Sequence, residues 1–121
     1  MPSNNFPIIY EQLRSVLQRS AVGMKIAHDL PGDFNLVTPG DTPRHQEIFF
    51  GAVKIQKNFV SYYLMPIYLY PDLLDGVSSS LLRHLKGKSC FRFTRLDDRL
   101  LDELNLLTQR GRQRFQQEGW A

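Results

Sequence analysis

The chain has 121 residues, of which 42% are hydrophobic, so one domain spanning residues 1–121 can build a core without a disulfide or structural metal. Its one cysteine, Cys90, excludes an internal disulfide and favours a reducing, cytoplasmic compartment. The net charge is +3, and the chain lacks the dense basic stripe of a dedicated nucleic-acid binder, so we expect no nucleic-acid partner. No apolar stretch reaches the ~20 residues that span a bilayer, so we expect no membrane contact.

The first quarter of the chain predicts a helix and two strands. Residues 5–21 place apolar side chains three and four positions apart, which is the spacing of an amphipathic helix. Residues 24–30 and 34–38 have the composition of short strands, and Pro31-Gly32-Asp33 between them is a turn tripeptide.

The middle of the chain predicts a β-hairpin. Residues 47–56 and 59–65 are rich in β-branched and aromatic side chains, and the two residues between them suit a tight turn. Pro66 and Pro71 follow. We expect these prolines to end the sheet or to hold residues 67–70 at an irregular edge.

The last third predicts a short helix, a strand and a long helix. Residues 78–85 begin with a serine suited to capping, and Gly87 is the expected stop of this helix. Residues 89–94 alternate with period two, which is typical of a strand with one buried face. Leucines from Leu100 onward recur at threes and fours, and Gly111 either brings this last helix close to a neighbour or ends it early.

This order of elements predicts an α+β fold. Antiparallel hairpins combined with terminal helices form a two-layer sandwich. We therefore expect a curved antiparallel sheet of about five strands, with the N- and C-terminal helices on one face.

Alternation along the central hairpin predicts large apolar groups on both faces of the sheet. On its first strand, one face is expected to hold Phe49, Val53 and Ile55, and the other face Ile48, Phe50 and Ala52. A sheet that is apolar on both sides needs a second cover, which is a loop, a partner subunit or a ligand.

Two sets of residues suggest where a ligand binds. The first is aromatic and consists of Phe49, Phe50, Tyr62, Tyr63, Tyr68 and Tyr70. It predicts either a concave face for a flat or apolar molecule, or core on one side and a dimer interface on the other. The second set is basic and consists of Arg83, His84, Lys86, Lys88, Arg92 and Arg95. It predicts either an anion site or a solvated surface.

A short acidic set offers the third hypothesis. Its members lie at the start of the last helix and are Asp97, Asp98, Asp102 and Glu103. Such oxygens are ligands for hard cations such as iron or magnesium. The alternative is a helix cap followed by an exposed, acidic face.

Several segments resemble the bacterial YdhG-like family, known as domain of unknown function 1801. The resemblance rests on Phe50–Ile55, on Val60–Pro66, on Leu85–Phe93 and on the final leucine-rich helix. It implies a small α+β fold with a curved antiparallel sheet. One branch of the family is described as frataxin-like, which implies intracellular iron binding or delivery as an alternative function, although no iron ligand carries over residue by residue.

These observations together predict non-enzymatic binding of a small anionic or aromatic ligand on the sheet face at Lys54, Tyr63 and Arg92. No nucleophile with a partner base is visible, so we expect no catalysis and no cofactor. Iron bound by Asp97, Asp98, Asp102 and Glu103 is one alternative. A homodimeric interaction module is the other.

Overall fold

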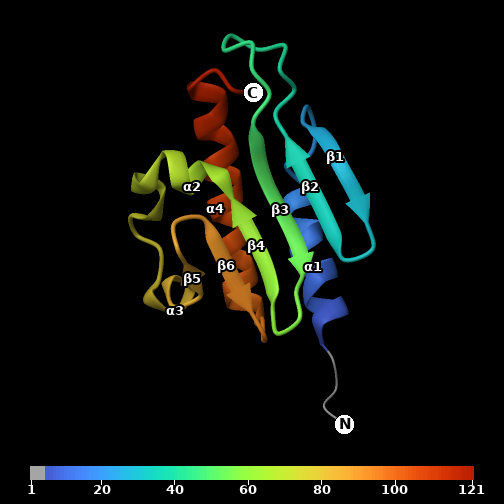
Figure 1. The fold of residues 1–121 in the computed structure, drawn as a ribbon. Coiled ribbons are helices and arrows are strands. Elements are labelled where there is room, and N and C mark those ends of the chain that lie inside the picture. The colour runs from blue at the N-terminus through green and yellow to red at the C-terminus, as the bar shows by residue number, and fades with distance from the viewer. Residues whose placement is uncertain (1–4) are drawn as a thin grey trace.

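A six-stranded antiparallel sheet, with helices on one face, organises residues 5–121, which are the residues that this computed structural model describes (Figure 1). The strands are β1 (Lys25–Leu30), β2 (Asp33–Val37), β3 (Phe49–Ile55), β4 (Val60–Leu64), β5 (Leu85–Lys86) and β6 (Cys90–Phe93), in the spatial order β1-β2-β3-β4-β6-β5. The helices are α1 (Phe6–Gln18), α2 (Met65–Leu69), the 3-10 helix η1 (Pro71–Leu74), α3 (Ser79–Leu82) and α4 (Asp98–Gln117). The predicted α+β fold is confirmed, with six strands instead of about five.

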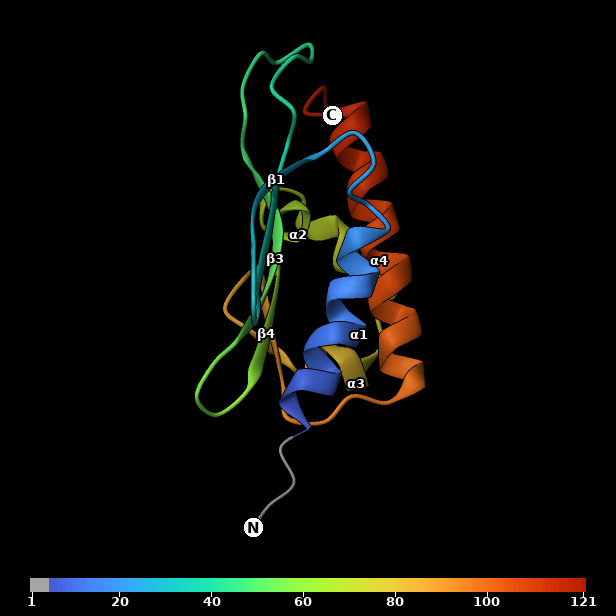
Figure 2. The same cartoon turned by 90° about the vertical axis from the view of Figure 1, so that its right-hand side faces the viewer.

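The terminal helices α1 and α4 form the second layer. Figure 2 shows the sheet edge-on, with α1 and α4 side by side on one face and no helix on the other. Both helices turn an apolar stripe to the sheet, and residues such as Leu13, Leu17 and Leu104 are fully buried there. Among residues 5–121, no helix is long and apolar enough to cross a membrane.

A β-bulge in β3 changes the face to which its aromatic side chain points. Leu36 pairs with Gly51 and Val37 with Phe49, so Phe50 has no partner on β2. A bulge lets two consecutive residues face the same side. The Phe50 ring accordingly packs edge to face against the Phe115 ring of α4, with 5.5 Å between the ring centres. The prediction that Phe50 lies on the face opposite Val53 was therefore wrong.

The face of the sheet away from the helices is consequently mixed and not uniformly apolar. Tyr62 of β4 donates or accepts a hydrogen bond with Thr108 of α4, so the alternate residues of β4 and its neighbours point outward. The outward residues of β3, β4 and β6 are Ala52, Lys54, Ser61, Tyr63, Cys90 and Arg92. We call this surface the outer face.

In the segment between β4 and β6, the expected end of the sheet at Pro66 is confirmed, because β4 ends at Leu64, while the predictions for residues 78–85 and for Gly87 were wrong. Pro66 and Pro71 lie in the first turns of α2 and η1, where a missing N–H leaves no hydrogen bond unmade. The predicted helix over 78–85 is only α3, capped by the Ser78 side chain. Gly87 does not stop that helix. With φ of 77° it forms the turn between β6 and the two-residue strand β5 that sequence analysis missed.

Gly111 lets α4 pack closely against α2, which decides between the two roles predicted for it. The helix continues past Gly111 to Gln117. A Cβ atom at this position would lie 2.9 Å from Cβ of Pro66, closer than two carbons can approach without displacement. The absence of a side chain is therefore what allows α2 and α4 to touch.

We predict that Gly111→Ala destabilises the fold. Alanine favours a helix by ~1 kcal/mol over glycine, but its methyl group would collide with the rigid Pro66 ring, and such overpacking costs ~1–3 kcal/mol. We expect a net loss of about 1 kcal/mol in the free energy of unfolding, measured by urea titration. Gln113→Ala, at an exposed site of the same helix, is the control and should change little. A Gly111→Ala variant more stable than the wild type would contradict this packing.

Candidate functional site

The three residues predicted to bind ligand lie together on the outer face. Lys54 of β3 pairs with Ser61 of β4, which pairs with Arg92 of β6, so these residues form one row across three strands. Tyr63 lies two residues along β4 and points to the same side. Figure 1 views the sheet from the side opposite the helices, where no helix covers β3, β4 and β6. The strand register therefore places the three residues on one face, as predicted.

The two cations of this row are not held in ion pairs by acids of the described chain. Neither Lys54 nor Arg92 takes part in an ion pair within residues 5–121. The Arg92 guanidinium lies 4.5 Å from the centre of the Phe59 ring, which orients it without cancelling its charge. Asp33, the strand partner of Lys54 on the other side, is hydrogen-bonded to His28 at 2.8 Å.

Ser61 is a functional candidate that the sequence analysis missed. Ser61 is only 1% exposed, and its hydroxyl has no hydrogen-bond partner among the residues that the structure describes. A buried hydroxyl without a partner costs roughly 1–3 kcal/mol. Ser61 sits between Lys54 and Arg92, so this polar atom lies at the centre of the row. Only the strand register reveals this position, since the three residues are far apart in the sequence.

The aromatic set does not form one face. Phe50 and Tyr70 both pack edge to face against Phe115, and Tyr62 is buried against α4. These rings belong to the core. Tyr63 points outward, and Tyr68 lies on α2 and is half exposed. The single concave aromatic surface considered from the sequence is therefore not present.

The basic set is also divided. Arg83 of this set bonds to residues of α3, and the His84 ring packs against Phe93 at 4.7 Å. Lys86 pairs with Cys90, while Lys88 lies in the β5–β6 turn. Arg92 is the member that shares a row with Lys54. The anion site suggested by the sequence therefore reduces to Arg92 and its neighbours on the outer face.

Two members of the acidic set hold the starts of helices, because Asp97 caps α4 and Glu103 binds Ser78, the N-cap residue of α3. The Asp97 carboxylate accepts a hydrogen bond from the backbone N–H of Leu100 at 2.8 Å. The Glu103 carboxylate accepts hydrogen bonds from both the backbone N–H and the hydroxyl of Ser78. Within residues 5–121 there is no group of three or more His, Cys, Asp or Glu side chains that could hold a metal ion, so Asp97, Asp98, Asp102 and Glu103 do not form a ligand set.

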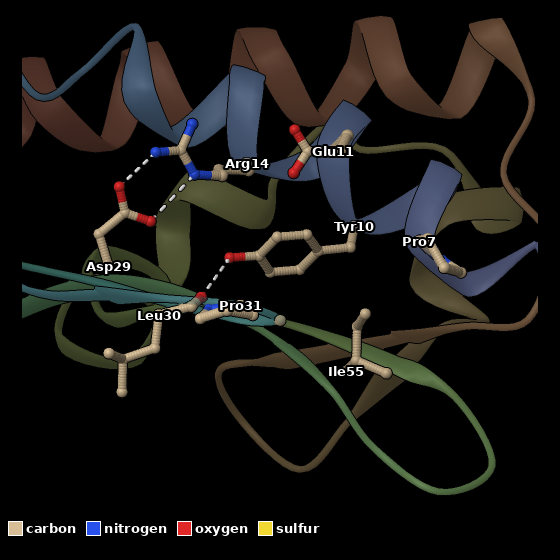
Figure 3. A pocket seen from close by; sticks show the side chains of 9 residues that line it. Pro7, Tyr10, Glu11, Arg14, Asp29, Leu30, Pro31 and Ile55 are labelled. Carbon is tan, nitrogen blue, oxygen red and sulfur yellow. Dashed lines mark hydrogen bonds and ion pairs between the residues drawn. The ribbon is translucent and has the colours of Figure 1, made fainter.

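A large groove lies elsewhere, between α1 and the β1–β2 turn (Figure 3). Its volume is about 840 Å³. Figure 3 shows Asp29 holding Arg14 through two hydrogen bonds, and the Tyr10 hydroxyl donating to the Leu30 carbonyl oxygen at 3.4 Å. Burial raises the pKa of Tyr10, so its hydroxyl keeps its proton. Because Arg14 is paired with Asp29 and Glu11 adds a further carboxylate, the groove suits an anionic ligand less than the outer face does.

No family model, curated protein or solved structure matches this chain. The resemblance to the YdhG-like family therefore stays a prediction.

We predict that Tyr62 makes stability fall at high pH. Complete burial raises the pKa of Tyr62 well above its usual value near 10, outweighing the opposing hydrogen bond with Thr108. Above pH ~10 the unfolded chain loses this proton while the folded protein keeps it, so the free energy of unfolding falls by about 1.4 kcal/mol per pH unit.

Denaturation of Tyr62→Phe between pH 9 and 11 (roughly the range in which tyrosine ionises) checks this prediction. The variant should lose about 1–2 kcal/mol at neutral pH, because the Thr108 hydroxyl loses its partner. Above pH ~10 its stability should fall less steeply than that of the wild type. Tyr68→Phe, at a half-exposed ring, should keep the wild-type slope. Equal slopes in the wild type and Tyr62→Phe would show that Tyr62 is not the responsible group.

Proposed function

We propose that this protein binds a small anionic ligand with an aromatic part on the outer face, without converting it chemically. The observation that carries the proposal is the row Lys54–Ser61–Arg92, in which two cations that form no ion pair within residues 5–121 flank a buried hydroxyl without a hydrogen-bond partner among the described residues. Tyr63 beside this row supplies an aromatic surface.

The spacing of the two cations suits a ligand with two negative charges. Neighbouring strands lie about 4.8 Å apart, so the Cα atoms of Lys54 and Arg92 are separated by roughly 10 Å. Both side chains are long enough to converge above Ser61 from opposite sides. A phosphate group accepts hydrogen bonds from guanidinium and ammonium donors together, and each such charge-assisted bond is stronger than a neutral one.

The remaining groups of the outer face suit the rest of such a ligand. The Tyr63 hydroxyl makes no hydrogen bond within residues 5–121, so it can orient a polar substituent. The Phe59 ring already holds the Arg92 guanidinium from one side, which leaves the other side of that planar group for an aromatic ring. These features favour an aryl phosphate or a similar anion over an inorganic ion alone.

A second copy of the chain is a less suitable occupant of the outer face. If two copies packed their outer faces together about a two-fold axis, the cations Lys54, Lys86 and Arg92 of one copy would face the same three cations of the other. Like charges brought into an interface repel each other and have to be desolvated. The homodimeric alternative therefore lacks the charge complementarity that a small anion has.

Titration with phenyl phosphate, followed by ¹H–¹⁵N NMR, tests the proposal. We expect saturable shift changes centred on Ser61, Tyr63 and Arg92, which weaken as salt rises because the attraction is electrostatic. Lys54→Gln and Arg92→Gln should each weaken binding about 5-fold, equivalent to ~1 kcal/mol. Arg19→Gln removes the same charge at the exposed residue that follows α1 and should leave binding unchanged. Benzyl alcohol, which lacks the charge, should bind more weakly.

Ser61→Ala separates binding from folding. Removing a buried hydroxyl that has no partner should leave the free energy of unfolding unchanged or raise it by up to ~1 kcal/mol. The same substitution should weaken phenyl phosphate binding, because the proposal requires the side chains that cover this hydroxyl to move aside and expose it as a donor to the ligand. The proposal fails if phenyl phosphate produces no saturable change, if its shifts map to another surface, or if Arg92→Gln binds it as well as the wild type.

A further inference from the structure

A concave site lies at the β5 edge of the sheet, away from the row described above. It is a cleft between α2, η1 and the β5–β6 turn, with a volume of about 460 Å³. This volume falls within the range of roughly 300–1,000 Å³ that is usual for small-molecule sites. Residues that line the cleft include Ile67, Tyr68, Leu74, Leu85, Gly87 and Lys88.

The walls of this cleft are apolar and carry one charge. Ile67 and Leu74 come from the two short helices that follow β4, and Leu85 comes from the edge strand. The Tyr68 ring forms another wall and is 50% exposed. Among the described residues that line the cleft, Lys88 alone is charged. An apolar body with one negative charge is therefore the complementary ligand.

The charge of Lys88 is available to a ligand. Within residues 5–121, Lys88 takes part in no ion pair or side-chain hydrogen bond, and its ammonium nitrogen lies 6.0 Å from the centre of the Tyr68 ring. Asp72 of the neighbouring η1 is held by Arg114 at 2.8 Å, and that hydrogen bond lowers the pKa of the Asp72 carboxyl. Asp72 is thus already paired.

The β5–β6 turn leaves room beside Lys88. Gly87 adopts a φ of 77°, and a Cβ atom at this position would meet no other atom within 4 Å. The backbone at the rim of the cleft is therefore open on the side of the turn. A carboxylate that reaches Lys88 from the cleft has no side chain of residue 87 in its way.

We propose that this cleft binds a monocarboxylic acid with an apolar body, which places the body against Ile67, Tyr68 and Leu85 and the carboxylate on Lys88. A single cation matches a single negative charge, whereas the row Lys54–Ser61–Arg92 on the outer face presents two. The cleft combines members of the aromatic and basic sets, Tyr68 and Lys88, that are twenty positions apart in the sequence and meet only in the fold. This site is independent of the one on the outer face.

NMR titration with octanoate, with octan-1-ol as the uncharged counterpart, tests the proposal. We expect octanoate to cause saturable shifts in α2, β5 and the β5–β6 turn, and octan-1-ol to bind at least about 5-fold more weakly. Lys88→Gln should weaken octanoate binding by a similar factor and leave octan-1-ol binding unchanged. Lys88→Arg should retain most of the affinity. Lys86→Gln removes the same charge from the same hairpin at an exposed residue outside the cleft, and should bind octanoate normally.

Four outcomes would overturn the proposal. The first is the absence of saturable binding, and the second is equal octanoate affinity in Lys88→Gln and the wild type. The third is a set of octanoate shifts that maps to Ser61, Tyr63 and Arg92, which would support the outer face and remove the cleft. The fourth is a change of the cleft signals with protein concentration alone, which would show that a second copy occupies it. Failure of phenyl phosphate at the outer face leaves this test unaffected.

Discussion

The bulge in β3 is the constraint on which the rest of the structure depends. It turns the consecutive residues Phe50 and Gly51 toward the helix layer, where Phe50 meets Phe115 and Gly51 meets Leu17. A Cβ atom on Gly51 would lie 2.9 Å from a methyl carbon of Leu17 and 3.0 Å from the Tyr63 carbonyl oxygen, so only glycine lets α1 approach β3 this closely. Both helices therefore pack on one face of the sheet.

A one-sided core leaves the other face of the sheet free for polar groups. With Phe50 directed inward, the middle of the outer face is built from the small residues Ala52 and Ser61 and the longer side chains around them. Such a surface needs no covering layer for its stability. Its charged groups are therefore available to bind a ligand. For this reason we assign the proposed function to this face and not to the larger groove beside α1.

Much of the fold could be predicted from the sequence, because periodic patterns record which side of an element is buried. The three-and-four spacing gave α1 and α4, and alternation gave the β3–β4 hairpin and β6. The errors have local physical causes. A bulge shifts alternation by one residue, so Phe50 was placed on the wrong face. The two-residue strand β5 is too short to show a period.

The site could be predicted only in part, for a related reason. Lys54, Tyr63 and Arg92 lie where alternation is undisturbed, and the register places them on one face as expected. Ser61 lies between Lys54 and Arg92 because β4 pairs with β3 and β6, and no local pattern in the sequence specifies this pairing. The cleft at Lys88 depends on contacts between α2 and the β5–β6 turn. Contacts of this kind follow from tertiary packing and leave no signature in sequence spacing.

The central claim is that the outer face is accessible and attracts anions. Cys90 can report on both properties, because it is the one cysteine of the chain and lies on that face beside Tyr63. The decisive measurement is the rate at which its thiol in the folded protein reacts with two aromatic disulfide reagents, one carrying two carboxylates and one an uncharged dipyridyl disulfide. We predict that the dicarboxylate is favoured relative to its rate with the unfolded chain, and that Arg92→Gln or high salt removes this preference. A thiol that reacts only after unfolding, or with no preference for the anionic reagent, would contradict the account.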